Sequence, residues 1–87
     1  MSQVKIMANK YSDNYWKEIV DCFEVSSLVI EGIPQDVINV LYGLMGENAV
    51  KWVDNPIPLL DNAMARNLVK TEEGYRALKV LLTRMPL

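Results

Sequence analysis

The segment NPIPLLDN, residues 55–62, constrains the fold of this chain most strongly. Pro56 and Pro58 lack the N–H that a helix needs, and each disfavours helical geometry at the residue before it. A regular helix therefore cannot cross this segment. Further prolines and glycines interrupt the rest of the chain, at positions 32, 34, 46 and 86. The sequence thus predicts short helices joined by tight turns.

Apolar periodicity places the predicted helices between these breaks. They cover residues 13–24, 34–45, 47–54, 63–69 and 72–85, and the first begins at a cap on Ser12 or Asp13. The β-branched segment 25–32 has no second strand candidate to pair with, so it is either a helix extension or an extended connection. We therefore expect an all-α fold, a compact bundle of about five short helices.

Length and composition bound the organisation of the chain. Its 87 residues make one domain, for which we expect a flexible arm over residues 1–11 and a single helical domain over 12–87. The hydrophobic fraction of 51% is generous for a small core, which favours an interface with a partner over a dense monomeric core.

Targeting and membrane signals are weak in this sequence. The most apolar region, residues 37–46, is far shorter than the roughly 20 residues that span a bilayer, and the N-terminus has no signal-peptide form. The lone Cys22 fits a reducing compartment and is expected to pack as a small hydrophobe. We expect a cytoplasmic protein that does not enter a membrane.

The charges are unevenly distributed, although the net charge is only −2. Residues 11–61 carry nine acids against Lys17 and Lys51, a net of −7, whereas residues 62–87 carry five bases against two acids, a net of +3. The basic end could steer an acidic partner or contact phosphates weakly. Ordinary solvated helix charge is the alternative.

Catalytic and metal-binding constellations are missing from the sequence. Histidine is absent, a single cysteine makes no zinc site, and the four glycines stand alone instead of forming a phosphate-binding loop. The adjacent acids Glu72 and Glu73 are better explained as partners of a helix N-terminus than as an acid–base pair. We therefore expect no enzymatic activity, no cofactor and no metal.

The last predicted helix has an unusual start, in which Thr71 is the expected cap and Gly74 lies in the first turn. Glycine inside a helix costs about 1 kcal/mol relative to alanine. We expect that its missing side chain lets the preceding short helix near Leu68, or Trp52, pack directly on the backbone.

The apolar arc of the last predicted helix is wide, which suits a core contact on one side and a partner on the other. Burial at the centre of the monomer is the alternative.

The second half of the chain carries an ordered series of motif residues. A tryptophan precedes an asparagine–proline turn and a leucine, and paired apolar residues then precede a threonine–glutamate–glutamate–glycine cap and a valine- and leucine-rich helix. The residues are Gly46, Ala49, Trp52, Val53, Asn55, Pro56, Leu59 or Leu60, Leu68, Val69, Thr71, Glu72, Glu73, Gly74, Val80, Leu81, Leu82 and Arg84. Over roughly residues 44–85 the series resembles the toxin-binding C-terminal domain of MbcA/ParS/Xre-type bacterial antitoxins.

The chain departs from that family's pattern at two places. The family usually has glycines after the leucine and a proline before the short helix, where this sequence has Asp61, Asn62 and Ala65. The short helix could therefore start earlier or sit at a different angle. The N-terminal half also has no evident helix-turn-helix unit, which many relatives carry, although residues 32–41 resemble the start of one.

The resemblance implies an antitoxin-like protein that forms a homodimer and neutralises a cognate toxin of the RES-domain type in a type II toxin–antitoxin system. Region 44–87 would be the toxin-binding part. Because the family's C-terminal region faces the toxin active site, the implied partner-binding residues are Lys79, Arg84, Met85, Pro86 and Leu87, which would occlude that site and place a cation there. The implied structural motif residues are Trp52, Asn55, Pro56, Thr71 and Gly74. Arg84 could instead simply complement the helix C-terminus.

Two other functions stay open at the level of sequence. The first is a DNA-binding transcriptional regulator, suggested by the basic residues Arg66, Lys70, Arg76 and Lys79, although their small number and the missing recognition helix make this function weaker. The second is a non-enzymatic adaptor of the same fold, because a fold does not determine a function.

Overall fold

A computed structural model describes residues 2–84 of the chain. The elements, in chain order, are α1 (Gln3–Ala8), α2 (Asp13–Asp21), α3 (Gln35–Met45), the 3-10 helix η1 (Gly46–Asn48), α4 (Ala49–Trp52), β1 (Pro56–Ile57), the 3-10 helix η2 (Pro58–Leu60), β2 (Ala63–Met64), α5 (Ala65–Leu68) and α6 (Glu72–Arg84). Helices dominate, which confirms the predicted all-α class, and β1 and β2 form only a tiny antiparallel sheet. The radius of gyration is 11.9 Å, close to the value of about 12 Å for a folded chain of this length.

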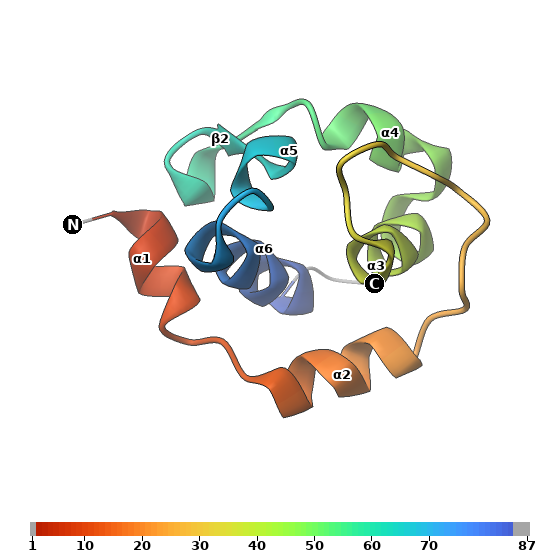
Figure 1. The fold of residues 1–87 in the computed structure, drawn as a ribbon, viewed down its shortest axis with the longest axis horizontal. Coiled ribbons are helices and arrows are strands. Elements are labelled where there is room, and N and C mark those ends of the chain that lie inside the picture. Colours follow the sequence, from red (N-terminus) through yellow and green to blue (C-terminus); the bar gives the residue numbers. More distant parts are fainter. Residues whose placement is uncertain (1, 85–87) are drawn as a thin grey trace.

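Helix α6 lies at the centre of the molecule (Figure 1). α1 and α5 pack along it, and α2 and α3 also contact it. Every residue from Ala77 to Leu82 is buried, Lys79 included. The wide apolar arc of this helix is therefore covered by the chain's own elements. The expectation that one side of the helix contacts the core and the other a partner is wrong over residues 77–82.

Residues 3–8 form helix α1, where the sequence predicts a flexible arm. Ser2 caps this helix by accepting a hydrogen bond from the backbone N–H of Lys5, and Met7 is buried in the core. The Asp61 carboxylate accepts hydrogen bonds from the Ser2 hydroxyl at 2.9 Å and the Val4 N–H at 3.3 Å. The arm expectation is corrected because α1 gains its contacts from distant parts of the chain.

Helix α2 is amphipathic as predicted, and the cap is Ser12. Its only buried residue is Trp16, and Cys22, expected to pack inside, is exposed just after the helix ends. The following residues 24–30 have no helical or paired structure. Of the two alternatives for segment 25–32, the extended connection is the one observed.

Helix α3 forms much of the core, because Val37, Val40 and Leu41 are fully buried along it. Gly46 adopts φ +63, a conformation that favours glycine, and there α3 gives way to η1 and then α4. The single helix predicted over residues 47–54 is thus a 3-10 turn followed by one short α-helical turn.

The proline-containing segment turns back on itself in a small hairpin. Pro56 pairs with Met64 and Ile57 with Ala63. Two consecutive non-glycine residues in its turn, Asp61 and Asn62, have positive φ values of 59° and 61°. α5 begins after the hairpin, at Ala65, later than the predicted residue 63 because β2 occupies the first two positions.

Candidate partner-binding site

The structure separates the two described residues that the sequence predicts to bind a partner. Lys79 is only 8% exposed in the middle of α6, whereas Arg84 is exposed at its end. Five positions on an α-helix correspond to about 140° of rotation, so the two side chains leave different faces. The other predicted residues, Met85, Pro86 and Leu87, lie outside the described part of the chain.

Lys79 is enclosed by aromatic side chains. Its Nζ donates a hydrogen bond to the Tyr11 hydroxyl at 2.9 Å and lies 3.9 Å from the Tyr75 ring centroid, 4.4 Å from that of Tyr11 and 5.8 Å from that of Trp16. These separations are typical of cation–π contacts. Burial lowers the pKa of the Lys79 ammonium from its ordinary value.

Asp36 at the start of α3 completes this cluster. Its carboxylate accepts hydrogen bonds from the Trp16 indole N–H at 2.9 Å and the Tyr75 hydroxyl at 2.6 Å. Burial, followed by the hydrogen bond to Asp36, raises the pKa of Tyr75 well above its usual range. The cluster therefore joins α2, α3 and α6, and it is an internal scaffold that leaves the Lys79 cation little access to a partner.

Arg84 lies instead beside a groove between α1, η2 and the end of α6, here called the α1–α6 groove. The groove has a volume of about 440 Å³, and its lining residues are Gln3, Ile6, Met7, Lys10, Leu59, Leu81 and Arg84. Leu59 is 65% exposed. The Arg84 guanidinium contacts the Met7 thioether at 3.8 Å. An apolar floor with the cations Lys10 and Arg84 around it suits an apolar side chain that neighbours a carboxylate.

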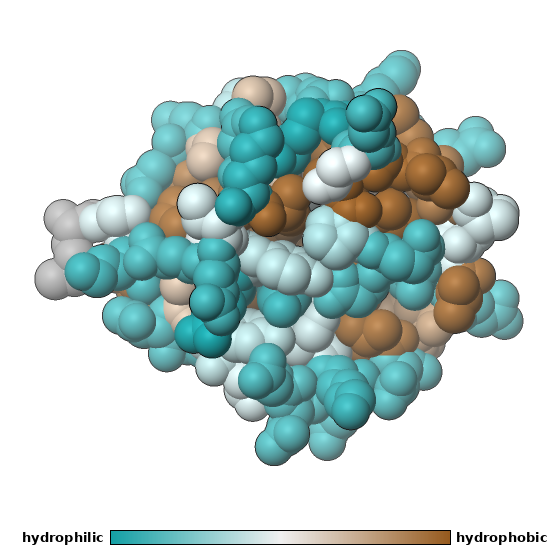
Figure 2. Space-filling view, in the orientation of Figure 1, coloured by the Kyte–Doolittle hydropathy of each residue, from teal (hydrophilic) through white to brown (hydrophobic). Residues whose placement is uncertain are grey.

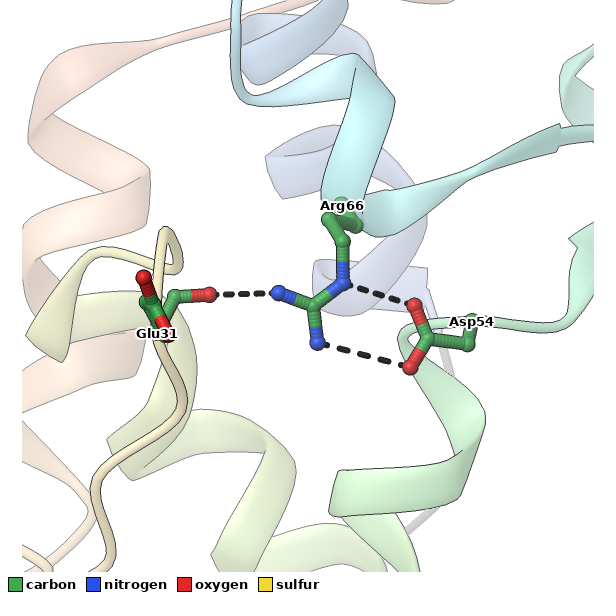
Figure 3. A network of polar contacts seen from close by, with 3 residues as sticks. All are labelled: Glu31, Asp54 and Arg66. Atoms are coloured by element: carbon green, nitrogen blue, oxygen red, sulfur yellow. Dashed lines mark hydrogen bonds and ion pairs between the residues drawn. The ribbon is translucent and has the colours of Figure 1, made fainter.

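Arg66 makes polar contacts with Asp54 and Glu31 (Figure 3). Its Nε donates to Asp54 Oδ1 at 2.6 Å and its Nη2 to Oδ2 at 3.4 Å, while Nη1 donates to the Glu31 carbonyl oxygen at 2.6 Å. Arg66 thereby holds the pKa of the Asp54 carboxyl below its usual value. The geometry fixes the chain just before α3 to the elements that flank the hairpin.

These contacts weaken the basis for DNA binding. Of the four basic residues that suggested it, Arg66 pairs with Asp54, Lys79 is buried, and Arg76 pairs with Glu72 at 2.8 Å. Lys70 is exposed. The predicted basic surface is therefore largely occupied by intramolecular contacts, and DNA binding stays a prediction with less support.

The structural motif residues lie together in the second half of the chain. Trp52 ends α4, and Asn55 and Pro56 lead into the hairpin. The Thr71 hydroxyl accepts a hydrogen bond from the Gly74 N–H at 3.0 Å, so the predicted cap is present. A Cβ built on Gly74 would collide with the Leu68 carbonyl oxygen and lie 3.0 Å from Leu68 C and Cα. The predicted direct packing of the preceding helix on this glycine is confirmed for Leu68.

Within residues 2–84, no group of three or more His, Cys, Asp or Glu side chains could hold a metal ion. Over the same residues, no helix combines the length and apolar character needed to cross a bilayer.

The sequence predicts Arg84 as a partner-binding residue but gives no signal for the groove beside it. The groove depends on α1, which the sequence left unpatterned, and on Leu59, whose exposure follows from the hairpin turn. The burial of Lys79 was also missed, because its partners Tyr11 and Trp16 are far away in sequence.

Comparisons of the chain with known proteins give no relatives. No protein-family model, no curated protein and no solved structure matches it.

Proposed function

We propose that this chain is an antitoxin-like protein that binds and neutralises a cognate protein toxin of the RES-domain type in a type II toxin–antitoxin system. The motif series over roughly residues 44–85 motivates the proposal. Binding, and not catalysis, would be the activity, and a cytoplasmic location is part of the same proposal.

The observation that carries the proposal is the backbone conformation at the chain's main departure from the family pattern. Where the family usually has glycines, Asp61 and Asn62 adopt φ values of 59° and 61°. This left-handed region favours glycine, and Asn and Asp are the residues that tolerate it best after glycine. Asp61 and Asn62 thus have a backbone conformation that glycine adopts easily, and this supports the proposal at the place where the sequence departs from the family pattern.

The contact at Gly74 supports the same proposal. Glycine in the threonine–glutamate–glutamate–glycine cap matches a place where the Leu68 backbone leaves no space for a side chain. Thr71 and Gly74 thus hold the start of α6 close to the end of α5.

We assign the toxin-binding surface to the α1–α6 groove and Arg84; the predicted residues 85–87 lie outside the described part of the chain. The groove offers an apolar floor beside two cations, Lys10 and Arg84. A partner could bury an apolar side chain in the groove and pair a neighbouring carboxylate with one of these cations. Lys79 is removed from this surface, because its ammonium is held by Tyr11 and Tyr75.

Co-expression with the product of the neighbouring gene tests the proposal. We expect a stable complex and relief of that product's toxicity. Leu59→Asp and Arg84→Glu should each weaken the complex by about tenfold or more, since both change the groove. Lys70→Glu changes an exposed cation outside the groove and is the matched control. A neighbouring product that is not toxic, together with pull-downs that recover no protein, would refute the function.

A further inference from the structure

A second pocket, between the start of α2 and the end of α6, has no role in the proposed function and is here called the α2–α6 pocket. Its volume is about 200 Å³. It shares Lys10 and Arg84 with the α1–α6 groove, but the rest of its wall comes from α2, the residues just before α2 and the end of α6. Among the described residues, no Asp or Glu lines it. The charge of the pocket is therefore positive.

The two cations of this pocket are available to a ligand. Within residues 2–84, neither Lys10 nor Arg84 lies within ion-pair distance of a carboxylate, whereas the other two arginines, Arg66 and Arg76, are paired. Both Lys10 and Arg84 are exposed. A guanidinium and an ammonium together match the charge of about −1.5 to −2 that a phosphate monoester carries at pH 7.

Ser12 adds a neutral donor to the pocket. Its Oγ caps α2 by accepting a hydrogen bond from the Tyr15 N–H at 3.4 Å, so its own hydrogen can be donated to a ligand. The Thr83 hydroxyl is engaged, because it donates to a backbone carbonyl oxygen of its own helix at 2.6 Å. Asp13, the acid in the first turn of α2, lines a different pocket. Two cations and a hydroxyl donor are a set that binds the oxygens of a phosphate group.

Aromatic rings form another part of the wall. Trp16 and Tyr11 are fixed by the buried cluster, since the Trp16 indole N–H donates to Asp36 and the Tyr11 hydroxyl accepts from Lys79. A wall that is already fixed loses little freedom when a ligand binds. Tyr15, by contrast, is 51% exposed. Its ring can pack against a flat ring of a ligand in an offset-stacked or edge-to-face arrangement.

The α2–α6 pocket is separate from the hydrophobic surface of the molecule. Figure 2 shows hydrophobic surface gathered on the upper right of the view, over the region where Figure 1 draws α4. No residue of α4 lines the pocket. Charge and aromatic character, and not a broad apolar surface, therefore decide which ligand the pocket favours.

We propose that the α2–α6 pocket binds a small phosphate monoester that carries a flat ring. Lys10, Arg84 and Ser12 hold the phosphate oxygens, and Tyr15 packs on the ring. A carboxylate has only two oxygens and one charge, so it matches this donor set less well. The volume of the pocket is below the roughly 300–1,000 Å³ of pockets for drug-sized ligands, which favours a free molecule with a single ring. The inference is independent of the proposed function.

Isothermal titration calorimetry of the full chain with phenyl phosphate tests the ligand class. We expect a Kd of about 1 mM or below. Inorganic phosphate lacks the ring, and phenyl sulfate keeps the ring but carries a single charge, so each should bind about tenfold more weakly. No measurable binding of phenyl phosphate at about 10 mM, or equal affinity for phenyl phosphate and either of the other two anions, would overturn the proposal.

Substitutions test the place of binding. Lys10→Gln and Arg84→Gln should each weaken phenyl phosphate binding by about tenfold, whereas Lys70→Gln makes the same charge change at an exposed lysine outside the pocket and should have no effect. Tyr15→Ala should remove the preference over inorganic phosphate. Leu59→Ala changes the α1–α6 groove but not this pocket, so binding should stay unchanged. Equal losses for Lys70→Gln and Arg84→Gln, or a loss for Leu59→Ala, would reject the assignment to this pocket.

A phosphotyrosine side chain has the same chemistry as phenyl phosphate, and a short phosphotyrosine peptide separates the two sources. We expect the peptide to bind no more tightly than phenyl phosphate, because the pocket holds only a ring and its phosphate. A peptide that binds about tenfold more tightly or better would overturn the assignment to a free small molecule.

Discussion

Replacing Gly74 with alanine should destabilise the protein, although alanine is the better helix former. In the middle of a helix the exchange would gain about 1 kcal/mol. The new Cβ, however, would collide with the Leu68 carbonyl oxygen and lie 3.0 Å from two further backbone atoms of Leu68. Because these are backbone atoms, no rotation of a side chain can relieve the overlap.

The expected size of this effect follows from two opposing contributions. Overpacking a well-filled site costs about 1–3 kcal/mol, and the gain in propensity is smaller in the first turn, where Gly74 lies. We expect a net loss of about 1–2 kcal/mol in the free energy of unfolding. For a domain of this size that lowers Tm by roughly 5–15 °C.

Thermal unfolding followed by circular dichroism measures the Gly74→Ala effect. Glu73→Ala is the matched control, because Glu73 is the exposed neighbour in the same first turn and its replacement should change Tm by no more than a few degrees. Truncating the Leu68 side chain should not rescue Gly74→Ala, since the obstruction is the Leu68 main chain. A Gly74→Ala variant with unchanged or raised Tm would refute the packing argument.

Three further predictions follow from the site and the hairpin. The free energy of unfolding should fall as pH rises through about 10, because the raised pKa of Tyr75 keeps it protonated in the folded protein while it ionises in the unfolded chain. Tyr75→Phe should reduce this loss, measured by urea titrations at pH 8 and pH 11. An unchanged dependence of stability on pH in this variant would contradict the prediction. Asn62→Gly should keep or raise the free energy of unfolding by up to about 1 kcal/mol, because glycine adopts positive φ without strain; a loss of stability in the same assay would show that the turn depends on the Asn side chain. Arg66→Ala should speed amide exchange around Glu31, because it removes the hydrogen bond to that carbonyl oxygen, whereas Lys70→Ala should not.

The all-α class could be predicted because the breaks in the sequence are local. Pro56 and Pro58 exclude a regular α-helix across this segment whatever surrounds them, and Gly46 marks the end of α3 through its own backbone conformation. The Thr71 cap and the close packing at Gly74 are also local, since Leu68 is only a few residues away. These features need little knowledge of the tertiary structure.

The features that were missed depend on contacts between distant residues. Helix α1 is stabilised by Asp61 and by burial of Met7, neither of which the sequence of the first residues reveals. The sequence predicts Lys79 as a surface cation on the helix. In the folded chain the rings of Tyr11 and Trp16, which are distant in sequence, lie against its ammonium group and enclose it. The α1–α6 groove exists because α1 folds onto α6.

We propose that the chain binds a protein toxin through the α1–α6 groove and Arg84. The most direct measurement is the affinity of the purified chain for the product of the neighbouring gene by isothermal titration calorimetry. We expect a specific complex that Arg84→Glu weakens by about tenfold or more and that Lys70→Glu leaves unchanged. Absence of binding, or equal affinity for both variants, would contradict it.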